Sequence, residues 1–194
     1  MKTNINNLIV SRALTFATKA HSGAVRKGTD IPYIVHPIEA ALVVSGITSD
    51  PELIAAALLH DTVEDTDTSI ENIRDEFGER VANLVADESE NKREDQCSRE
   101  TWRIRKLETL SHIAAASTDA KTVALGDKLA NMRAIYRDYN EIGDKLWERF
   151  NTKNPADHAW YYSSLADALA ELSHTAAWQE YKELVDTVFG KYRG

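Results

Sequence analysis

Apolar residues recur at three- and four-residue intervals along almost the whole chain, which is the pattern of amphipathic helices. Leu8, Ala13 and Ala17, for example, fall on one face of a helix predicted near the N-terminus. No segment keeps the strict apolar–polar alternation of a strand, and 8 Gly and 4 Pro are too few for a turn-rich all-β sandwich. We therefore predict an all-α fold of about nine or ten helices, built as a single domain over residues 1–194.

Capping residues indicate where several helices begin and end. Asp50-Pro51 and Asn154-Pro155 each combine an N-cap side chain with a proline in the first helical turn. The first pair predicts a helix over residues 51–63. The segment Thr68–Glu71 has the form of a capping box, and Gly78 is typical of a helix stop.

Two polar stretches interrupt this helical pattern. Residues 22–35 contain two glycines and a proline and predict a loop, and a helix is expected over residues 37–44. Residues 87–100 are polar and of mixed charge, and we predict a mobile loop there. Long helices are then expected over residues 102–115 and 120–139.

The composition excludes several classes of function. A formal net charge of −8 makes the chain a poor candidate for binding nucleic acid or an anionic membrane surface. Its apolar runs are far shorter than the roughly 20 residues of a membrane span. Residues 1–7 lack the apolar core of a secretory signal, so we expect a cytoplasmic protein. The single cysteine, Cys97, excludes an internal disulfide and a cysteine-based zinc cluster.

The most informative motif follows an apolar run that ends in His60-Asp61. Glu64 lies four residues after His60, and Asp65 lies four after Asp61, so helical spacing pairs these groups on adjacent faces. Four polar groups of this kind are costly to bury without a cation or hydrogen-bonding partners. The alternative interpretation is a solvated helix end with acidic capping residues.

Two further segments add candidate metal ligands. His36 precedes Pro37 at the start of a predicted helix, and Asp127 interrupts an otherwise apolar helix face with Asn131 one turn later. A mid-helix aspartate can equally serve a salt bridge to an arginine. Taken together, His36, His60, Asp61 and Asp127 offer two imidazoles and two carboxylates, a set that suits Mn²⁺, Fe²⁺ or Zn²⁺ better than Ca²⁺.

The order of these motifs resembles the HD superfamily of metal-dependent phosphohydrolases. The longer strings are similar to the hydrolase domain of RelA/SpoT homologues, which cleave the 3′-pyrophosphate from the alarmones ppGpp and pppGpp. The strings that carry this resemblance are Arg26-Lys27, Pro32–Pro37, Ala57–Thr66 and Gly126–Arg133. The resemblance covers a motif core of about residues 8–140 and leaves a helical extension over about 141–194, so the chain resembles a stand-alone small alarmone hydrolase.

The resemblance implies a role for each matching residue. The four candidate ligands would hold one metal ion, Mn²⁺ in characterised relatives, with Fe²⁺ or Zn²⁺ as alternatives. Glu64 and Asp65 would position or deprotonate the attacking water. Arg26, Lys27 and Asn131 would contact a small nucleotide substrate, and Arg133 shares their motif context. The chain departs from the family pattern at Gly28, at Gly126 and at Ala134.

Aromatic residues cluster in the C-terminal third of the chain. Residues with this helical spacing are most often part of a core. A purine-stacking wall is the alternative, and Tyr161 is the candidate for it. Arg103, Arg105 and Lys106 are candidates for a phosphate-binding surface, although most such side chains are simply solvated.

We therefore predict a metal-dependent (p)ppGpp 3′-pyrophosphohydrolase. Two alternatives remain at this stage. One is an HD phosphatase or phosphodiesterase that acts on another phosphorylated nucleotide such as NADPH. The other is a catalytically silent, metal-bound interaction module, which the presence of both Glu64 and Asp65 disfavours because a pure binding site has no need of them.

Overall fold

The fold is described from a computed structural model, which defines residues 6–88 and 98–192. Within these ranges the backbone forms ten α-helices and three short 3-10 helices, and its only β-type contact is an isolated bridge between Val25 and Pro32. The prediction of an all-α fold is therefore confirmed. Cys97 and most of the predicted mobile loop lie outside the described residues.

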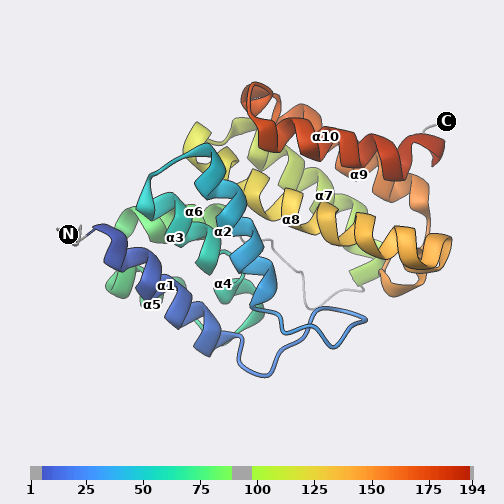
Figure 1. The fold of residues 1–194 in the computed structure, drawn as a ribbon. Coiled ribbons are helices and arrows are strands. Elements are labelled where there is room, and N and C mark those ends of the chain that lie inside the picture. Colours follow the sequence, from blue (N-terminus) through green and yellow to red (C-terminus); the bar gives the residue numbers. More distant parts are fainter. Residues whose placement is uncertain (1–5, 89–97, 193–194) are drawn as a thin grey trace.

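Figure 1 shows the order of the helices along the chain and the long loop between the first two helices. The helices are α1 (Asn6–Ala20), α2 (Val35–Ile47), α3 (Pro51–Leu59), α4 (Thr62–Asp65), α5 (Ile70–Phe77), α6 (Glu79–Glu88), α7 (Ser98–Ala115), α8 (Thr118–Ile142), α9 (Pro155–Ala168) and α10 (Ala176–Phe189). The 3-10 helices are η1 (Gly143–Arg149), η2 (Ala170–Leu172) and η3 (Gly190–Tyr192). None of the helices in the described part of the chain is long and apolar enough to cross a membrane.

Most of the predicted caps are present. The Asp50 side chain accepts a hydrogen bond from the Glu52 backbone N–H, and Asn154 does the same for Ala156. Gly78 ends α5 with a positive φ of 91°, a conformation that favours glycine. The capping box was predicted one residue too early, because its N-cap is Ser69 and its reciprocal partner is the Asn72 side chain.

The helix predicted over residues 51–63 is broken in the structure. α3 ends at Leu59, His60 and Asp61 form a turn, and α4 is a separate four-residue helix. The Thr62 hydroxyl donates to the Leu59 carbonyl oxygen over 2.7 Å, so a side chain occupies an acceptor at the end of α3. This turn places His60 and Asp61 at the junction of two helices.

Other boundaries differ by a few residues from those predicted. α2 covers residues 35–47 and α8 covers residues 118–142, so both exceed the predicted lengths. The predicted loop over residues 87–100 is shorter at both ends, since α6 includes residues 87–88 and α7 includes residues 98–100. These ends were placed from apolar spacing alone, which locates a helix boundary only to within about two to four residues.

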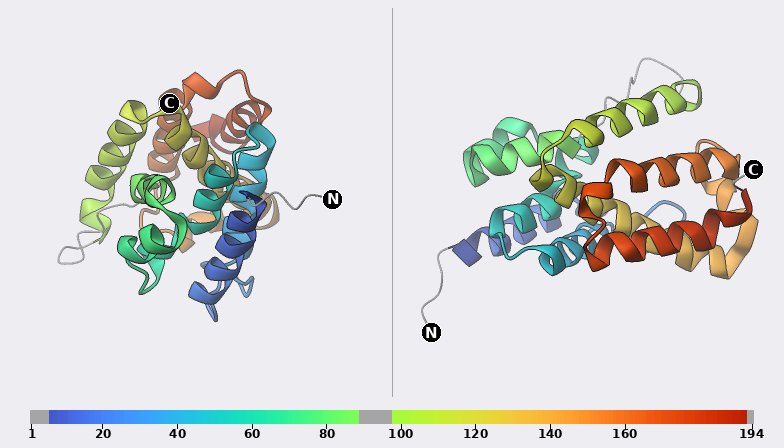
Figure 2. Two further views of the ribbon diagram at one scale, coloured as in Figure 1. Left: turned by 90° about the vertical axis from the view of Figure 1, so that its left-hand side faces the viewer. Right: turned by 90° about the horizontal axis from the view of Figure 1, so that it is seen from above.

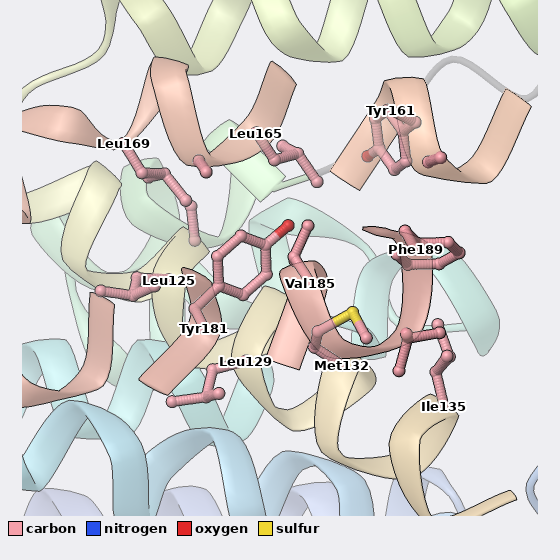
Figure 3. Packing of buried hydrophobic residues seen from close by; sticks show 14 of the residues in the cluster. Leu125, Leu129, Met132, Ile135, Tyr161, Leu165, Leu169, Tyr181, Val185 and Phe189 are labelled. Atoms are coloured by element: carbon pink, nitrogen blue, oxygen red, sulfur yellow. The ribbon is translucent and has the colours of Figure 1, made fainter. Parts of the chain in front are cut away.

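Two apolar clusters form the core, and α2 and α8 contribute buried residues to both. The first joins α8, α9 and α10, and its largest fully buried side chain is Tyr181. Figure 3 shows side chains of α8, α9 and α10 that point toward one another around Tyr181. The second cluster joins α1, α3, α5 and α6. The views in Figure 2 show α9 and α10 side by side, and α10 packs against α8.

Close contact between α2 and α8 joins these two halves. A Cβ added to Gly126 of α8 would lie 2.7 Å from Val44 Cγ2 and 2.9 Å from the carbonyl oxygen of Ala40, both on α2. The missing side chain at Gly126 therefore lets the two helix backbones approach closely. Because α2 carries His36 and α8 carries Asp127, this contact sets the distance between two candidate metal ligands.

Candidate active site

Four polar side chains from three separate segments converge at the junction of α2, α3 and α8. His36 Nε2 lies 3.0 Å from Asp127 Oδ1 and 3.3 Å from Asp61 Oδ2. His60 Nε2 lies 3.0 Å from Asp61 Oδ2, 3.4 Å from Asp127 Oδ1 and 3.3 Å from His36 Nε2. The structure thus brings together all four residues that the sequence analysis assigned to one metal ion.

The local backbone orients one of these imidazoles. The Nδ1 atom of His60 lies 2.8 Å from the carbonyl oxygen of Ala57, one turn earlier in α3. A carbonyl oxygen only accepts, so Nδ1 carries a proton and Nε2 is the nitrogen that faces the cluster. A histidine held in this way is arranged as metal ligands usually are in proteins.

The donor set fits a divalent transition metal. Ligand atoms of His36, His60 and Asp127 all lie within 4.8 Å of one another, and all three residues are buried. Asp61 adds a fourth donor, with 16% of its side chain exposed. Two imidazole nitrogens and two carboxylate oxygens suit Mn²⁺, Fe²⁺ or Zn²⁺, and burial without a cation would leave two carboxylates close together.

The charges in this cluster stabilise each other. Burial acts to raise the pKa of Asp61, but the two histidines outweigh it and hold that pKa well below its usual range. Burial acts in the same direction on Asp127, where Lys128 and the histidines hold the pKa well below its usual range. Both aspartates are therefore ionised and available as ligands at neutral pH.

Asp127 is anchored through both of its oxygens. Oδ2 accepts from Lys128 Nζ at 2.5 Å, and Lys128 also contacts Glu88 Oε2 at 3.3 Å. Oδ1 accepts from Asn131 Nδ2 at 2.6 Å, and the Asn131 oxygen in turn accepts from Arg26 Nη2 at 2.8 Å. This chain of contacts links the metal ligand on α8 to Arg26 in the loop before α2.

A tyrosine links the metal cluster to the predicted catalytic acids. The Tyr33 hydroxyl lies 2.7 Å from Asp61 Oδ2 and 2.9 Å from Asp65 Oδ2. Burial and these two carboxylates raise the pKa of Tyr33 far above its ordinary value, so the hydroxyl keeps its proton. Glu64 is the neighbour of Asp65 in α4 and lines the same cavity.

The cluster lies in a cavity of about 500 Å³. Its wall combines acidic, basic and aromatic side chains from α2, α4, α6, α7, α8 and α9 and from the loop before α2. The basic groups among its described lining residues are Arg26, Lys27, Arg105, Lys106 and Lys128. The same wall carries seven carboxylates, so an anionic ligand would need a bound divalent ion as well as these basic groups.

Most of the predicted substrate-contacting residues line this cavity. Arg26, Lys27, Asn131 and Tyr161 all do so. Tyr161 also belongs to the apolar cluster, with 7% of the residue exposed, so it is both core and cavity wall. Arg133 does not appear among the described lining residues.

The position of Arg133 does not support the predicted substrate contact. Its guanidinium forms a bidentate ion pair with Glu180 of α10, with two hydrogen bonds of 2.6 Å. A helix residue two positions after Asn131 faces a different side of α8, which explains why motif position alone misplaced it.

The structure also adds cavity residues to which the sequence analysis gave no role in the site. One of them is Lys128, whose ion pair with Asp127 is buried. The rings of Trp102, Phe150 and His158 contact one another and form an aromatic part of the cavity wall. Tyr33 adds the hydroxyl described above. Lys128 had one available signal, because a Lys next to an Asp within an apolar helix needs a partner.

Comparison with known proteins agrees with this geometry. The family described as HD domain matches residues 13–153. A guanosine-3′,5′-bis(diphosphate) 3′-pyrophosphohydrolase of Aquifex aeolicus is 40% identical over 129 residues, which cover 66% of this chain and 18% of that protein. The enzyme of the same name from Danio rerio, MESH1, is 38% identical over 132 residues, which cover 66% of this chain and 70% of that protein.

Two solved structures share the fold. One is described as a metazoan ortholog of SpoT that hydrolyzes ppGpp and plays a role in starvation responses. It has a TM-score of 0.73 and 25% identity and covers 96% of this chain and 97% of its own. The lmo0812 protein of Listeria monocytogenes EGD-e has a TM-score of 0.70 and 28% identity, and covers 80% of this chain and 99% of its own. With the family match over most of its length and the histidine–aspartate cluster at its centre, this chain belongs to the HD domain family.

Proposed function

We propose that this protein is a metal-dependent hydrolase that releases pyrophosphate from the 3′ position of ppGpp and pppGpp. The observation that carries the proposal is one arrangement of side chains. His36, His60, Asp61 and Asp127 meet in a cavity that is also lined by Glu64, Asp65 and five basic side chains. The names of the relatives supply the substrate class.

The four clustered side chains would hold the metal ion, and we propose Mn²⁺, with Fe²⁺ or Zn²⁺ as alternatives. A bound divalent ion polarises a phosphoryl oxygen and lowers the pKa of a bound water. Lys128 and Asn131 hold the two oxygens of Asp127, so this ligand enters the reaction already oriented.

Glu64 and Asp65 are proposed to orient the attacking water and to accept its proton. Both line the cavity from the short helix α4, next to the turn that carries His60 and Asp61. A positioned carboxylate that accepts this proton contributes typically 10²–10⁴-fold to a rate. Their common position on α4 is therefore consistent with a step that needs water activated beside the scissile phosphate.

The basic residues are proposed to bind the anionic substrate. Arg26 is oriented by Asn131 and stacks over the Tyr33 ring, with its guanidinium carbon 5.5 Å from the ring centroid. Lys27 lies next to it, and the Tyr161 ring lines the same cavity. Since Tyr161 belongs to α9, the C-terminal extension completes the cavity, and we propose that residues 1–194 form one domain.

The direct test is turnover of a nucleotide panel by the purified full chain with Mn²⁺. The panel contains ppGpp, pppGpp, NADPH and common nucleoside triphosphates, and anion-exchange chromatography follows the products. We expect release of pyrophosphate from ppGpp, and none from a His60→Ala variant that lacks a metal ligand. Phosphate release from NADPH alone, or equal turnover by His60→Ala, would overturn the proposal.

A second pair of variants tests the catalytic carboxylates. Glu64→Gln and Asp65→Asn should lower turnover of ppGpp by about 10²–10⁴-fold. Both should still bind Mn²⁺ in isothermal titration calorimetry, because neither is proposed as a ligand. A silent binding module would lose nothing measurable, and loss of Mn²⁺ from both variants would refute the assigned roles.

A further inference from the structure

The Tyr33 hydroxyl has no role in the proposed hydrolysis, yet it contacts two carboxylates of the site. It lies between the Oδ2 atoms of Asp61 and Asp65, at 2.7 Å and 2.9 Å. The same Asp61 oxygen faces both imidazoles of the metal cluster, at 3.0 Å and 3.3 Å. One phenolic oxygen thus contacts both a proposed metal ligand and a proposed catalytic carboxylate.

The ring that carries this hydroxyl is held from three sides. The His21 ring packs on it with centroids 4.7 Å apart, and the Arg26 guanidinium lies over it. The His36 ring meets its edge with centroids 5.9 Å apart. The backbone is held as well, because the Tyr33 N–H donates to the Ala24 carbonyl oxygen over 2.9 Å. The hydroxyl is therefore fixed in place without help from the two carboxylates.

A hydroxyl has a single proton to donate. When Tyr33 donates to Asp61, the contact with Asp65 is weakened, and a bond shared between the two is weaker toward each. The two carboxylates are consequently not independent. Their Oδ2 atoms share one partner, the Tyr33 hydroxyl. This shared contact fixes α4 relative to the turn that carries His60 and Asp61.

From this geometry we propose that Tyr33 is a positioning residue, whose hydroxyl holds the metal-ligating Asp61 and the water-orienting Asp65 in register with each other. The inference rests on the proposed function for its catalytic half. Its metal-binding half stands on the cluster geometry alone. Tyr33 itself transfers no proton and forms no bond with the substrate.

The test compares Tyr33→Phe with wild type in two measurements. Phenylalanine keeps the ring contacts with His21, Arg26 and His36 and removes only the hydroxyl. Without substrate, calorimetry should show Mn²⁺ affinity lowered by about 10–100-fold, as expected when the partner of a ligating carboxylate is lost. At saturating Mn²⁺, kcat for ppGpp should fall by about 10–100-fold while KM stays within about twofold, since the lost contacts are to the carboxylates.

Tyr181→Phe is the matched control. It also removes a buried tyrosine hydroxyl, which donates to the Tyr162 carbonyl oxygen over 2.9 Å, but it lies in the core cluster on α10. It should leave Mn²⁺ affinity and kcat at wild-type values. Tyr33→Leu, which also removes the ring, should raise KM as well because Arg26 loses its support.

The outcomes separate the two proposals. If wild type does not hydrolyse ppGpp, the proposed function fails, but lowered Mn²⁺ affinity in Tyr33→Phe still supports the contact with Asp61. If Tyr33→Phe binds Mn²⁺ as tightly as wild type, the inference is overturned, whatever the turnover. A fall in kcat equal to that of Tyr181→Phe would also overturn it, because a general loss of packing would then explain the effect.

Discussion

The close contact between Gly126 and α2 lets us predict how Gly126→Ala changes the stability of the fold and the affinity for Mn²⁺. A methyl group at Gly126 would lie 2.7 Å from Val44 Cγ2 and 2.9 Å from the Ala40 carbonyl oxygen. The valine is stiff at χ1, and the carbonyl belongs to the helix backbone. Neither atom can retreat unless α2 shifts away from α8.

Two opposing effects set the size of the change in stability. Alanine in place of a helical glycine favours folding by about 1 kcal/mol. Overpacking a tight helix contact costs about 1–3 kcal/mol. Gly46 on α2 separates the two effects, because nothing lies within 4 Å of a Cβ added there. Gly46→Ala should gain the first effect alone.

We therefore expect Gly126→Ala to be less stable than Gly46→Ala by about 1–3 kcal/mol in urea unfolding followed by circular dichroism. For a chain of this size that difference corresponds to about 2–4 °C in Tm per kcal/mol. Gly126→Ala should also bind Mn²⁺ more weakly, because a shift of α2 moves His36 away from Asp127. If the two variants unfold at the same urea concentration and bind Mn²⁺ equally, the argument from close helix approach is refuted.

Two further predictions concern charge. Lys128→Met should lower the free energy of unfolding by about 3–5 kcal/mol, because the buried Glu88 and Asp127 carboxylates lose the Lys128 ammonium. Adding Glu88→Gln to this variant should restore part of the loss. If the costs of the two substitutions in urea unfolding are simply additive, the shared ion pair is contradicted. Burial acts to raise the pKa of Asp50, but hydrogen bonds from Arg80 and from backbone N–H groups outweigh it and lower that pKa below its ordinary 3.8. The carboxylate therefore stabilises the fold above pH 3.8 and loses this contribution as the pH falls through the lowered pKa. Asp50→Ala should cost about 1 kcal/mol at pH 7 in urea unfolding, and a cost that is just as large near pH 3 would count against this assignment.

The helices themselves were largely predictable from local sequence. Asp50 and Asn154 accept from the backbone N–H groups two residues later, as their pairing with proline indicated. Interactions of this kind involve residues close in the chain, so a short segment contains all the information. The end of α3 was missed although it is also set locally, because the apolar spacing continues to Val63 while the Thr62 hydroxyl donates to the Leu59 carbonyl oxygen.

The residues that meet in the His–Asp cluster were also available from sequence as candidate metal ligands, through motif order and residue chemistry. The sequence could not give their partners. Tyr33 touches Asp61 and Asp65 only because the loop before α2 folds back across α4, and Arg133 faces Glu180 because of its angular position on α8. Each of these contacts joins residues that are dozens of positions apart.

The sequence by itself therefore determined the helical class, most helix starts and the donor types of the site, since these depend on short-range hydrogen bonds and on side-chain chemistry. Only the tertiary structure decided which donors share one cavity, how tightly α2 and α8 hold them, and that Lys128 and Tyr33 contact them. The physical reason is that side-chain positions across helices follow from packing. A single absent methyl group at Gly126 changes that packing without altering any local pattern.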